Sequence, residues 1–291
     1  MHWNLEQIVW ALMLAGHLVL LVVLMGRDRV RVFPWFTVLT VGSTLELLAE
    51  HLLNDKLTTL ATYWVNFSAM VVIWVLGVFV LAELARRIFS SGRAGLILNA
   101  RGWLGWTMVT VGLALLAIWF WGPWPTWQAL QTEYKTEPVQ FRIMVLVLTA
   151  TRGQMALAIL TVEVVLLFTL FAKRFGFNWR THPRQIASGL VANALGILSI
   201  SGLAEYLKHY RNLSSPEVLR QSQALVENAE KGRHVLGVLV LIWWIVCLWR
   251  DDPSTSPADL AGAPVPAVAG PPTLEGQVAV DPDDDEMSFR D

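Results

Sequence analysis

The chain has 291 residues, with 22 lysines and arginines against 23 aspartates and glutamates, so its formal net charge is −1. Hydrophobic residues make up 55% of it, charged residues only 15%, and its mean hydropathy is +0.49. This composition lies outside the usual soluble range and leaves no room for a soluble domain of ordinary size. We therefore expect the bilayer to be its solvent.

Seven apolar stretches are each long enough to cross a bilayer as a helix, which takes roughly 20 residues. The spans of a β-barrel would be shorter and would alternate strictly between polar and apolar positions, so these continuous runs predict helices. The expected fold class is all-α, a polytopic membrane protein built as a seven-transmembrane-helix bundle. The predicted spans are residues 5–25, 33–53, 63–84, 102–121, 143–172, 185–207 and 235–249.

The first stretch has an alternative interpretation as a secretory signal. It carries only Glu6 ahead of its apolar run, where a signal would carry basic residues, and no small-residue cleavage site follows it. We therefore predict a retained first helix.

Basic residues are unevenly distributed among the predicted connections. The connections after the first, third and fifth spans together hold eleven lysines and arginines. On the opposite side, the N-terminus and the first two connections hold three, and the last connection is an exception with five. Because short basic connections stay cytoplasmic, this bias predicts an N-terminus outside and a cytoplasmic C-terminus. The eleven are Arg27, Arg29, Arg31, Arg86, Arg87, Arg93, Arg101, Lys173, Arg174, Arg180 and Arg184.

The composition divides the chain into a transmembrane domain, residues 1–250, and an acidic Pro/Ala-rich tail, residues 251–291. The tail has ten acidic residues and one basic residue, Arg290, so it carries −9 and the remainder +8. Such a segment buries too little apolar surface to offset its ordering entropy, and we expect it to be disordered in the cytoplasm. It either recruits a basic partner, folds back on the chain's own basic connections, or stays solvated.

Ionisable residues inside the spans are the main site candidates, because charge in hydrocarbon is costly unless it is paired or hydrated. The candidates are His17 in the first span, Glu46 and Glu50 on one helical face of the second, and Arg152 and Glu163 in the fifth. In one hypothesis, His17, Glu46, Glu50 and Arg152 line a polar cavity that binds a substrate, a lipid headgroup or a proton. In the other, Arg152 forms a structural ion pair with a glutamate, and Glu163 is protonated or reaches the interface.

The fifth predicted span is too long for the hydrocarbon, so it must tilt, protrude or bend. Gly153, beside Arg152, is the expected place for a bend, since broken helices often mark binding sites in transporters. The sixth span instead presents small residues that let two backbones approach closely. The predicted helix-packing face consists of Ser188, Ala192, Gly196 and Ser199.

Sequence motifs of known chemistry do not point to an enzyme. The chain has no HExxH, GxSxG or P-loop pattern, and its single cysteine, Cys247, allows neither an intramolecular disulfide nor a cysteine metal cluster. We therefore predict no catalytic residues, no metal site and no nucleic-acid partner, and we leave any cofactor open.

The third span begins with Tyr63-Trp64 and ends through Ala82-Glu83 to Arg86-Arg87, and a small-residue sixth span and a Trp-rich seventh follow. In these features the chain resembles a group of uncharacterised bacterial seven-helix integral membrane proteins, over about residues 5–250. The resemblance implies the same topology in the bacterial inner (cytoplasmic) membrane, and the group brings no known activity.

The expected function is that of a non-enzymatic sensor, scaffold or accessory subunit of a membrane complex. Its partners would be the lipid bilayer and either another membrane protein or a second copy of the chain. The alternative is a small transporter or membrane-embedded enzyme that uses the intramembrane Arg/Glu/His site. A sensor needs a cytoplasmic output, for which only the tail is available, whereas a transporter needs a hydrated route through the spans.

Overall fold

A computed structural model of the chain describes residues 5–53, 56–90, 111–117, 125–135, 137–172, 181–210 and 216–251. The chain separates into two units, Met1–Ser254 and Thr255–Asp291, and the second lies outside the described residues. The predicted tail falls outside them too, except for Asp251. Of the predicted fourth span, 102–121, only 111–117 is described, and it is helical.

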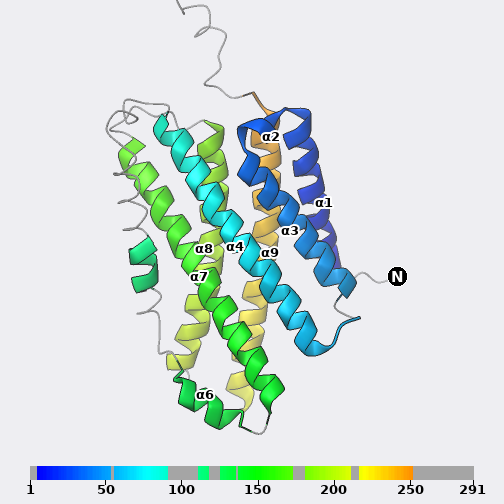
Figure 1. The fold of residues 1–291 in the computed structure, drawn as a ribbon, viewed down its shortest axis with the longest axis vertical. Helices are drawn as coiled ribbons and strands as arrows, with labels where there is room; N and C mark the ends of the chain where they lie inside the picture. Colours follow the sequence, from blue (N-terminus) through cyan, green and yellow to red (C-terminus); the bar gives the residue numbers. More distant parts are fainter. Residues whose placement is uncertain are drawn as a thin grey trace, which may run out of the picture. The chain divides into compact units, whose positions relative to one another are not determined.

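The described part is helical throughout, which confirms the predicted all-α class (Figure 1). Six of its helices are long and apolar enough to cross a membrane, so the chain is a multi-pass membrane protein. These six are α1, α3, α4, α7, α8 and α9. The helices are α1 (Leu5–Gly26), α2 (Arg29–Val32), α3 (Pro34–Leu53), α4 (Thr59–Ser90), α6 (Trp127–Glu133), α7 (Pro138–Ala172), α8 (His182–Tyr210) and α9 (Pro216–Trp249).

Several helices extend beyond the apolar runs that predicted them. The largest difference is in α9, which begins at Pro216 although the predicted span begins at 235. Helix α7 has 35 residues, about 52 Å at the usual rise, and is continuous through Gly153. It is therefore longer than the hydrocarbon is thick.

The six long helices form a closed ring in the order α1, α3, α4, α7, α8 and α9, with α9 returning to α1 (Figure 1). Helices α4 and α7 run parallel, because Gly77 lies against Leu157 and Trp74 lies against Gly153. Both helices therefore begin at the same end of the bundle.

Helices α1 and α9 are also parallel neighbours. Gly16 lies against Leu241, and Met13 lies near Gly237. Residues near the start of α1 therefore lie beside residues near the start of the apolar part of α9. Both helices end at the same end of the bundle. We call it the arginine end, after Arg27, Arg29, Arg31, Arg86, Arg87 and Arg250.

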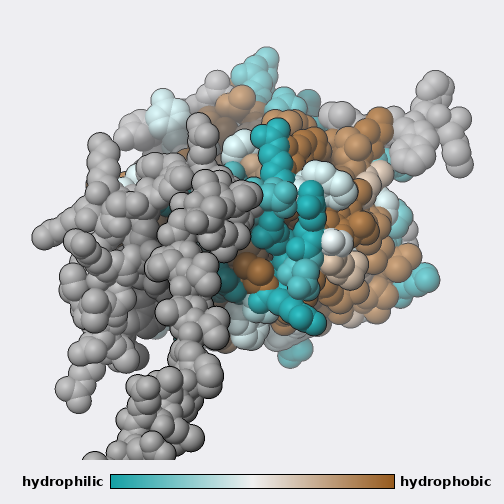
Figure 2. All heavy atoms as spheres, turned by 90° about the horizontal axis from the view of Figure 1, so that it is seen from above, coloured by the Kyte–Doolittle hydropathy of each residue, from teal (hydrophilic) through white to brown (hydrophobic). Residues whose placement is uncertain are grey.

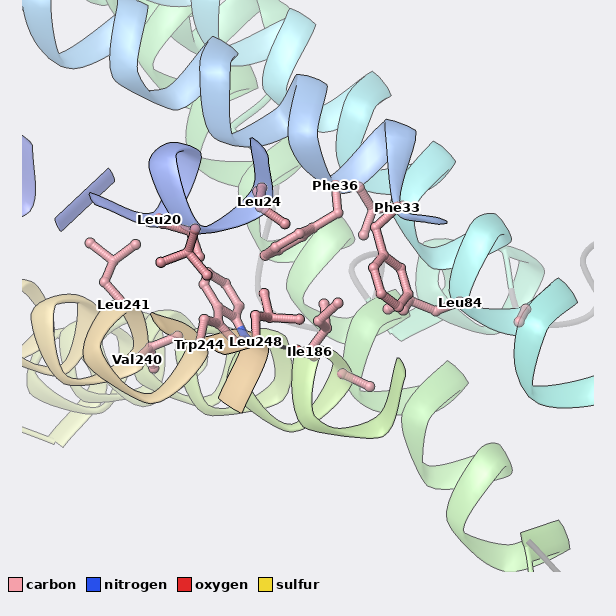
Figure 3. Packing of buried hydrophobic residues seen from close by; sticks show 14 of the residues in the cluster. Leu20, Leu24, Phe33, Phe36, Leu84, Ile186, Val240, Leu241, Trp244 and Leu248 are labelled. Carbon is pink, nitrogen blue, oxygen red and sulfur yellow. Dashed lines mark hydrogen bonds between the residues drawn. The ribbon is translucent and has the colours of Figure 1, made fainter. Parts of the chain in front are cut away.

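The largest buried cluster joins all six long helices around the indole of Trp244, with α7 contributing Phe168 (Figure 3). Its ring lies edge-on to Phe36, with centroids 5.1 Å apart, and its Nε1 donates to the carbonyl oxygen of Ile186 at 3.2 Å. Gly189 of α8 makes room for it, since a Cβ there would lie 2.4 Å from Nε1. A small residue at this position is what lets α8 and α9 pack closely.

The outer surface carries many exposed apolar side chains on all six long helices, such as Val22, Leu45 and Leu170. Soluble monomers rarely expose so much contiguous apolar surface, whereas lipid-facing helices must. Figure 2 looks onto the end that carries α2, and hydrophilic residues gather in the middle of the view beside a broad hydrophobic face. The described surface thus has an apolar side and a polar end, as a bilayer requires.

We expect Gly189→Ala to lower the free energy of unfolding by about 1–3 kcal/mol, because its methyl group displaces a hydrogen-bonded indole. Gly232→Ala is the matched control, since a Cβ at Gly232 meets nothing within 4 Å. Thermal unfolding can be followed by maleimide-dye labelling of Cys247, a buried thiol and the chain's only cysteine. Equal melting temperatures for the two variants would contradict this account of the α8/α9 contact.

Candidate functional site

The five predicted intramembrane residues lie on three helices and do not converge. His17 is buried in α1, and its Nδ1 donates to the carbonyl oxygen of Met13 at 2.8 Å, so this imidazole nitrogen is satisfied within its own helix. Glu46 and Glu50 lie one turn apart on α3, and Arg152 and Glu163 lie on α7.

The ring order separates the glutamates of α3 from Arg152. Helix α4 lies between α3 and α7 in the ring, packed against both. Among the described residues, neither Glu46 nor Glu50 forms an ion pair with Arg152. The glutamates of α3 and Arg152 thus lie on helices that are not neighbours in the ring.

Glu163 lies further along α7 toward the arginine end. Its Oε2 is buried and accepts no hydrogen bond. The parallel register of α4 and α7 places Glu163 at about the level of Glu83 on α4. Neither lies among the residues that line the pocket described next.

A pocket of about 250 Å³ opens between the start of α1, the end of α3 and the middle of α9, away from the arginine end. Each helix contributes one face, because the lining residues follow helical spacing within it. We call it the α1/α3/α9 pocket. Its lining consists of Glu6, Val9, Trp10, Met13, Leu47, Glu50, Lys231 and His234.

Trp10 holds α1 against α3 beside this pocket. Its Nε1 donates to the carbonyl oxygen of Leu47 at 3.3 Å, and its ring stacks on His51 with centroids 4.2 Å apart. The hydrogen bond crosses between helices where few donors are available, so it fixes the height of α1 along α3.

The two cations of α9 nearest the pocket are neutralised within their own helix. Lys231 Nζ donates to Glu227 Oε1 at 2.7 Å, and Arg233 Nε donates to Glu230 Oε2 at 2.9 Å. Both pairs have the i,i+4 or i,i+3 spacing of helical neighbours. These two ion pairs stabilise the helical conformation of the polar half of α9.

Of the predicted site residues, only Glu50 lines the pocket. Glu6, Lys231 and His234 were missed, because the last span was expected to start at 235 and Glu6 was read only as a residue preceding the first span. The charge spacing of Glu227 with Lys231 was a sequence signal that α9 begins earlier.

The small-residue face predicted on α8 is divided in the structure. Gly196 lies against Leu236 of α9, and Ala192 packs against the buried cluster. Ser188 and Ser199 are exposed. The closest approach to α9 occurs at Gly189, a neighbour of this face.

A second set of contacts ties the connection between α1 and α2, and the start of α2, to the end of α9 at the arginine end. Arg27 lies over the ring of Trp249, 5.2 Å from its centroid, and its Nη1 donates to Asp251 Oδ1 at 3.3 Å. Arg29 Nη2 donates to the carbonyl oxygen of Arg250 at 3.4 Å. We call these contacts the Arg27 clasp; they hold the point where the chain leaves α9.

Glu83 is a buried carboxylate that the sequence did not single out as a site. Only 8% of the residue is exposed, and its Oε2 accepts a hydrogen bond from the backbone N–H of Phe36 at 3.2 Å. Phe36 lies in the first turn of α3, whose N–H groups have no partner within their helix. Glu83 of α4 therefore caps α3, where the helix dipole also favours a negative charge.

Comparison of the chain with protein-family models, curated proteins and solved structures gave no match.

We expect Glu83→Ala to lower the free energy of unfolding by about 1–3 kcal/mol, because the Phe36 N–H is left buried without an acceptor. Glu83→Gln keeps an acceptor oxygen and should cost less. Melting temperatures from Cys247 labelling should decrease in the order wild type, Glu83→Gln, Glu83→Ala. Equal stability of the alanine and glutamine variants would contradict the capping role of Glu83.

Proposed function

We propose that the protein is a non-enzymatic membrane sensor, with a ligand pocket at one end of the bundle and the acidic tail as its output at the other. The observation that supports this proposal is the continuity of α9. The same helix provides Lys231 and His234 to the α1/α3/α9 pocket and ends at Trp249, beside the Arg27 clasp.

The parallel packing of α1 and α9 gives such a sensor a mechanical basis. The two helices contact each other between the pocket and the clasp, so a ligand that alters their spacing or height at one end also acts on the other. Helix shifts of about 1–2 Å are a common form of such coupling. The ligand must bind one arrangement of α1 and α9 more tightly than the other, since only a difference in affinity shifts the equilibrium between them.

The proposed topology has seven crossings, with the N-terminus outside and the C-terminus inside a bacterial cytoplasmic membrane. The parallel run of α4 and α7 supports a crossing by residues 102–121, because the chain has to return between them. The arginine end supports the orientation, since basic connections are retained on the cytoplasmic side. The pocket then opens toward the outer face and the tail toward the cytoplasm.

Cysteine accessibility in intact cells would test this topology. In a Cys247→Ala background, we expect an impermeant maleimide to label Lys56→Cys and Gln131→Cys from outside, because both lie at the end opposite the arginine end. Arg31→Cys should label only after permeabilisation. Labelling of Gln131→Cys and Lys56→Cys from opposite sides would contradict the seventh crossing, and labelling of Arg31→Cys in intact cells would contradict the orientation.

Copurification from the native membrane in mild detergent would test the output. We expect a stoichiometric protein partner with the full chain, and loss of that partner when the chain is truncated after Asp251. Glu133→Gln, an exposed change outside both the pocket and the tail, should retain it.

Two results would contradict the sensor. A partner that survives truncation would instead indicate a scaffold bound through its helix faces. A chain that purifies without any protein partner would favour the transporter or enzyme class.

A further inference from the structure

The α1/α3/α9 pocket has an excess of acidic charge that its own helices do not neutralise. Lys231 is paired with Glu227 at 2.7 Å and also feels the charge of Glu6, so one ammonium is shared between two carboxylates. Glu6 and Glu50 also line the pocket, and within the described part of the chain neither forms an ion pair. A ligand in this pocket consequently meets two carboxylates from two different helices.

Apart from the imidazole of His234, the rest of the lining is apolar and includes the indole of Trp10. Val9, Met13 and Leu47 provide hydrocarbon or thioether surface, and Trp10 adds its indole. The N–H of Trp10 is occupied by the carbonyl oxygen of Leu47, and one face of its ring stacks on His51, so the indole offers its other ring face and no donor. Aromatic ring faces attract cations through their quadrupole.

A metal ion fits this lining less well than an organic cation. Hard cations such as calcium take six or more oxygen ligands, whereas the pocket offers carboxylates from two residues beside aliphatic and aromatic surface. In the described ranges, no three acidic, histidine or cysteine side chains converge in a way that could hold a metal. The volume of about 250 Å³ suits a group of a few heavy atoms.

We propose that the α1/α3/α9 pocket binds an organic ammonium group, with Glu6 and Glu50 facing its charge and Trp10 with its apolar neighbours packing on its carbon atoms. The ammonium belongs either to a free amine or to the headgroup of a phospholipid, since both present the same chemistry. This inference rests on the proposed sensor function, for which it names the ligand class.

The experiment uses the full chain in phosphatidylglycerol nanodiscs and follows thermal unfolding by Cys247 labelling. The probes are choline chloride, its neutral carbon isostere 3,3-dimethylbutan-1-ol, and sodium chloride at equal ionic strength. We expect choline to raise the melting temperature in a saturable manner and the other two to leave it unchanged. An equal response to choline and to its isostere would overturn the role of charge, and no response to choline would overturn the proposal.

Matched variants locate the effect in the pocket. We expect Glu6→Gln and Glu50→Gln each to weaken choline binding by about fivefold, as the loss of one partly exposed charge pair implies. Both side chains are exposed, so the variants should fold, and their melting temperatures without ligand provide the check. Glu133→Gln makes the same change outside the pocket and should bind as wild type does. Equal binding by all four proteins would overturn the assignment to this pocket.

A second bilayer distinguishes the two sources of the ammonium. If a lipid headgroup occupies the pocket, phosphatidylethanolamine nanodiscs should stabilise wild type more than Glu50→Gln and should suppress the response to choline. If the ligand is a free amine, the response should be the same in both bilayers. If choline does not bind but the tail-dependent partner is retained, only the proposed ligand class is contradicted. If choline binds but no tail-dependent partner is found, only the proposed sensor output is contradicted.

Discussion

The fit of Trp244 over Gly189 determines how the ring of helices closes. Its indole contacts α3 through Phe36 and α8 through the carbonyl oxygen of Ile186, so one side chain of α9 sets the height of that helix against two others. Lipid provides no hydrophobic driving force between helices, and association therefore depends on close packing and interhelical hydrogen bonds. The pocket and the Arg27 clasp both depend on this height, because α9 contributes to each.

Polar groups inside the spans are mostly satisfied by their own helix. Thr37, Thr40 and Thr44 each donate to the carbonyl oxygen four residues earlier, as His17 does through Nδ1. Such bonds remove the cost of burying a hydroxyl or imidazole without linking two helices. Among the described residues, the interhelical bonds of Trp10, Glu83, Trp243 and Trp244 each join a side chain to a backbone group of a neighbouring helix.

How far the sequence predicted the structure depends on which physical quantity each prediction used. The spans 5–25 and 33–53 match α1 and α3 closely, because hydrocarbon thickness dictates the length of an apolar run. The start of α9 was misplaced, since hydropathy does not detect a helix that continues into a polar segment. The residues of the predicted site do not converge, because α4 lies between the helices that carry Glu50 and Arg152. A single sequence allows an estimate of depth along each span, but it does not show which helices are neighbours.

The contact between α1 and α9 joins the first and last described helices, so the ring closes only when α9 has been inserted. During synthesis, the flank of α1 that later meets Gly237 and Leu241 faces lipid, and the pocket lacks one of its three walls. A chain interrupted between α8 and α9 would have most of the spans and neither the pocket nor the clasp. The proposed ligand binding would therefore be a property of completed molecules alone, because only they have all three walls of the pocket.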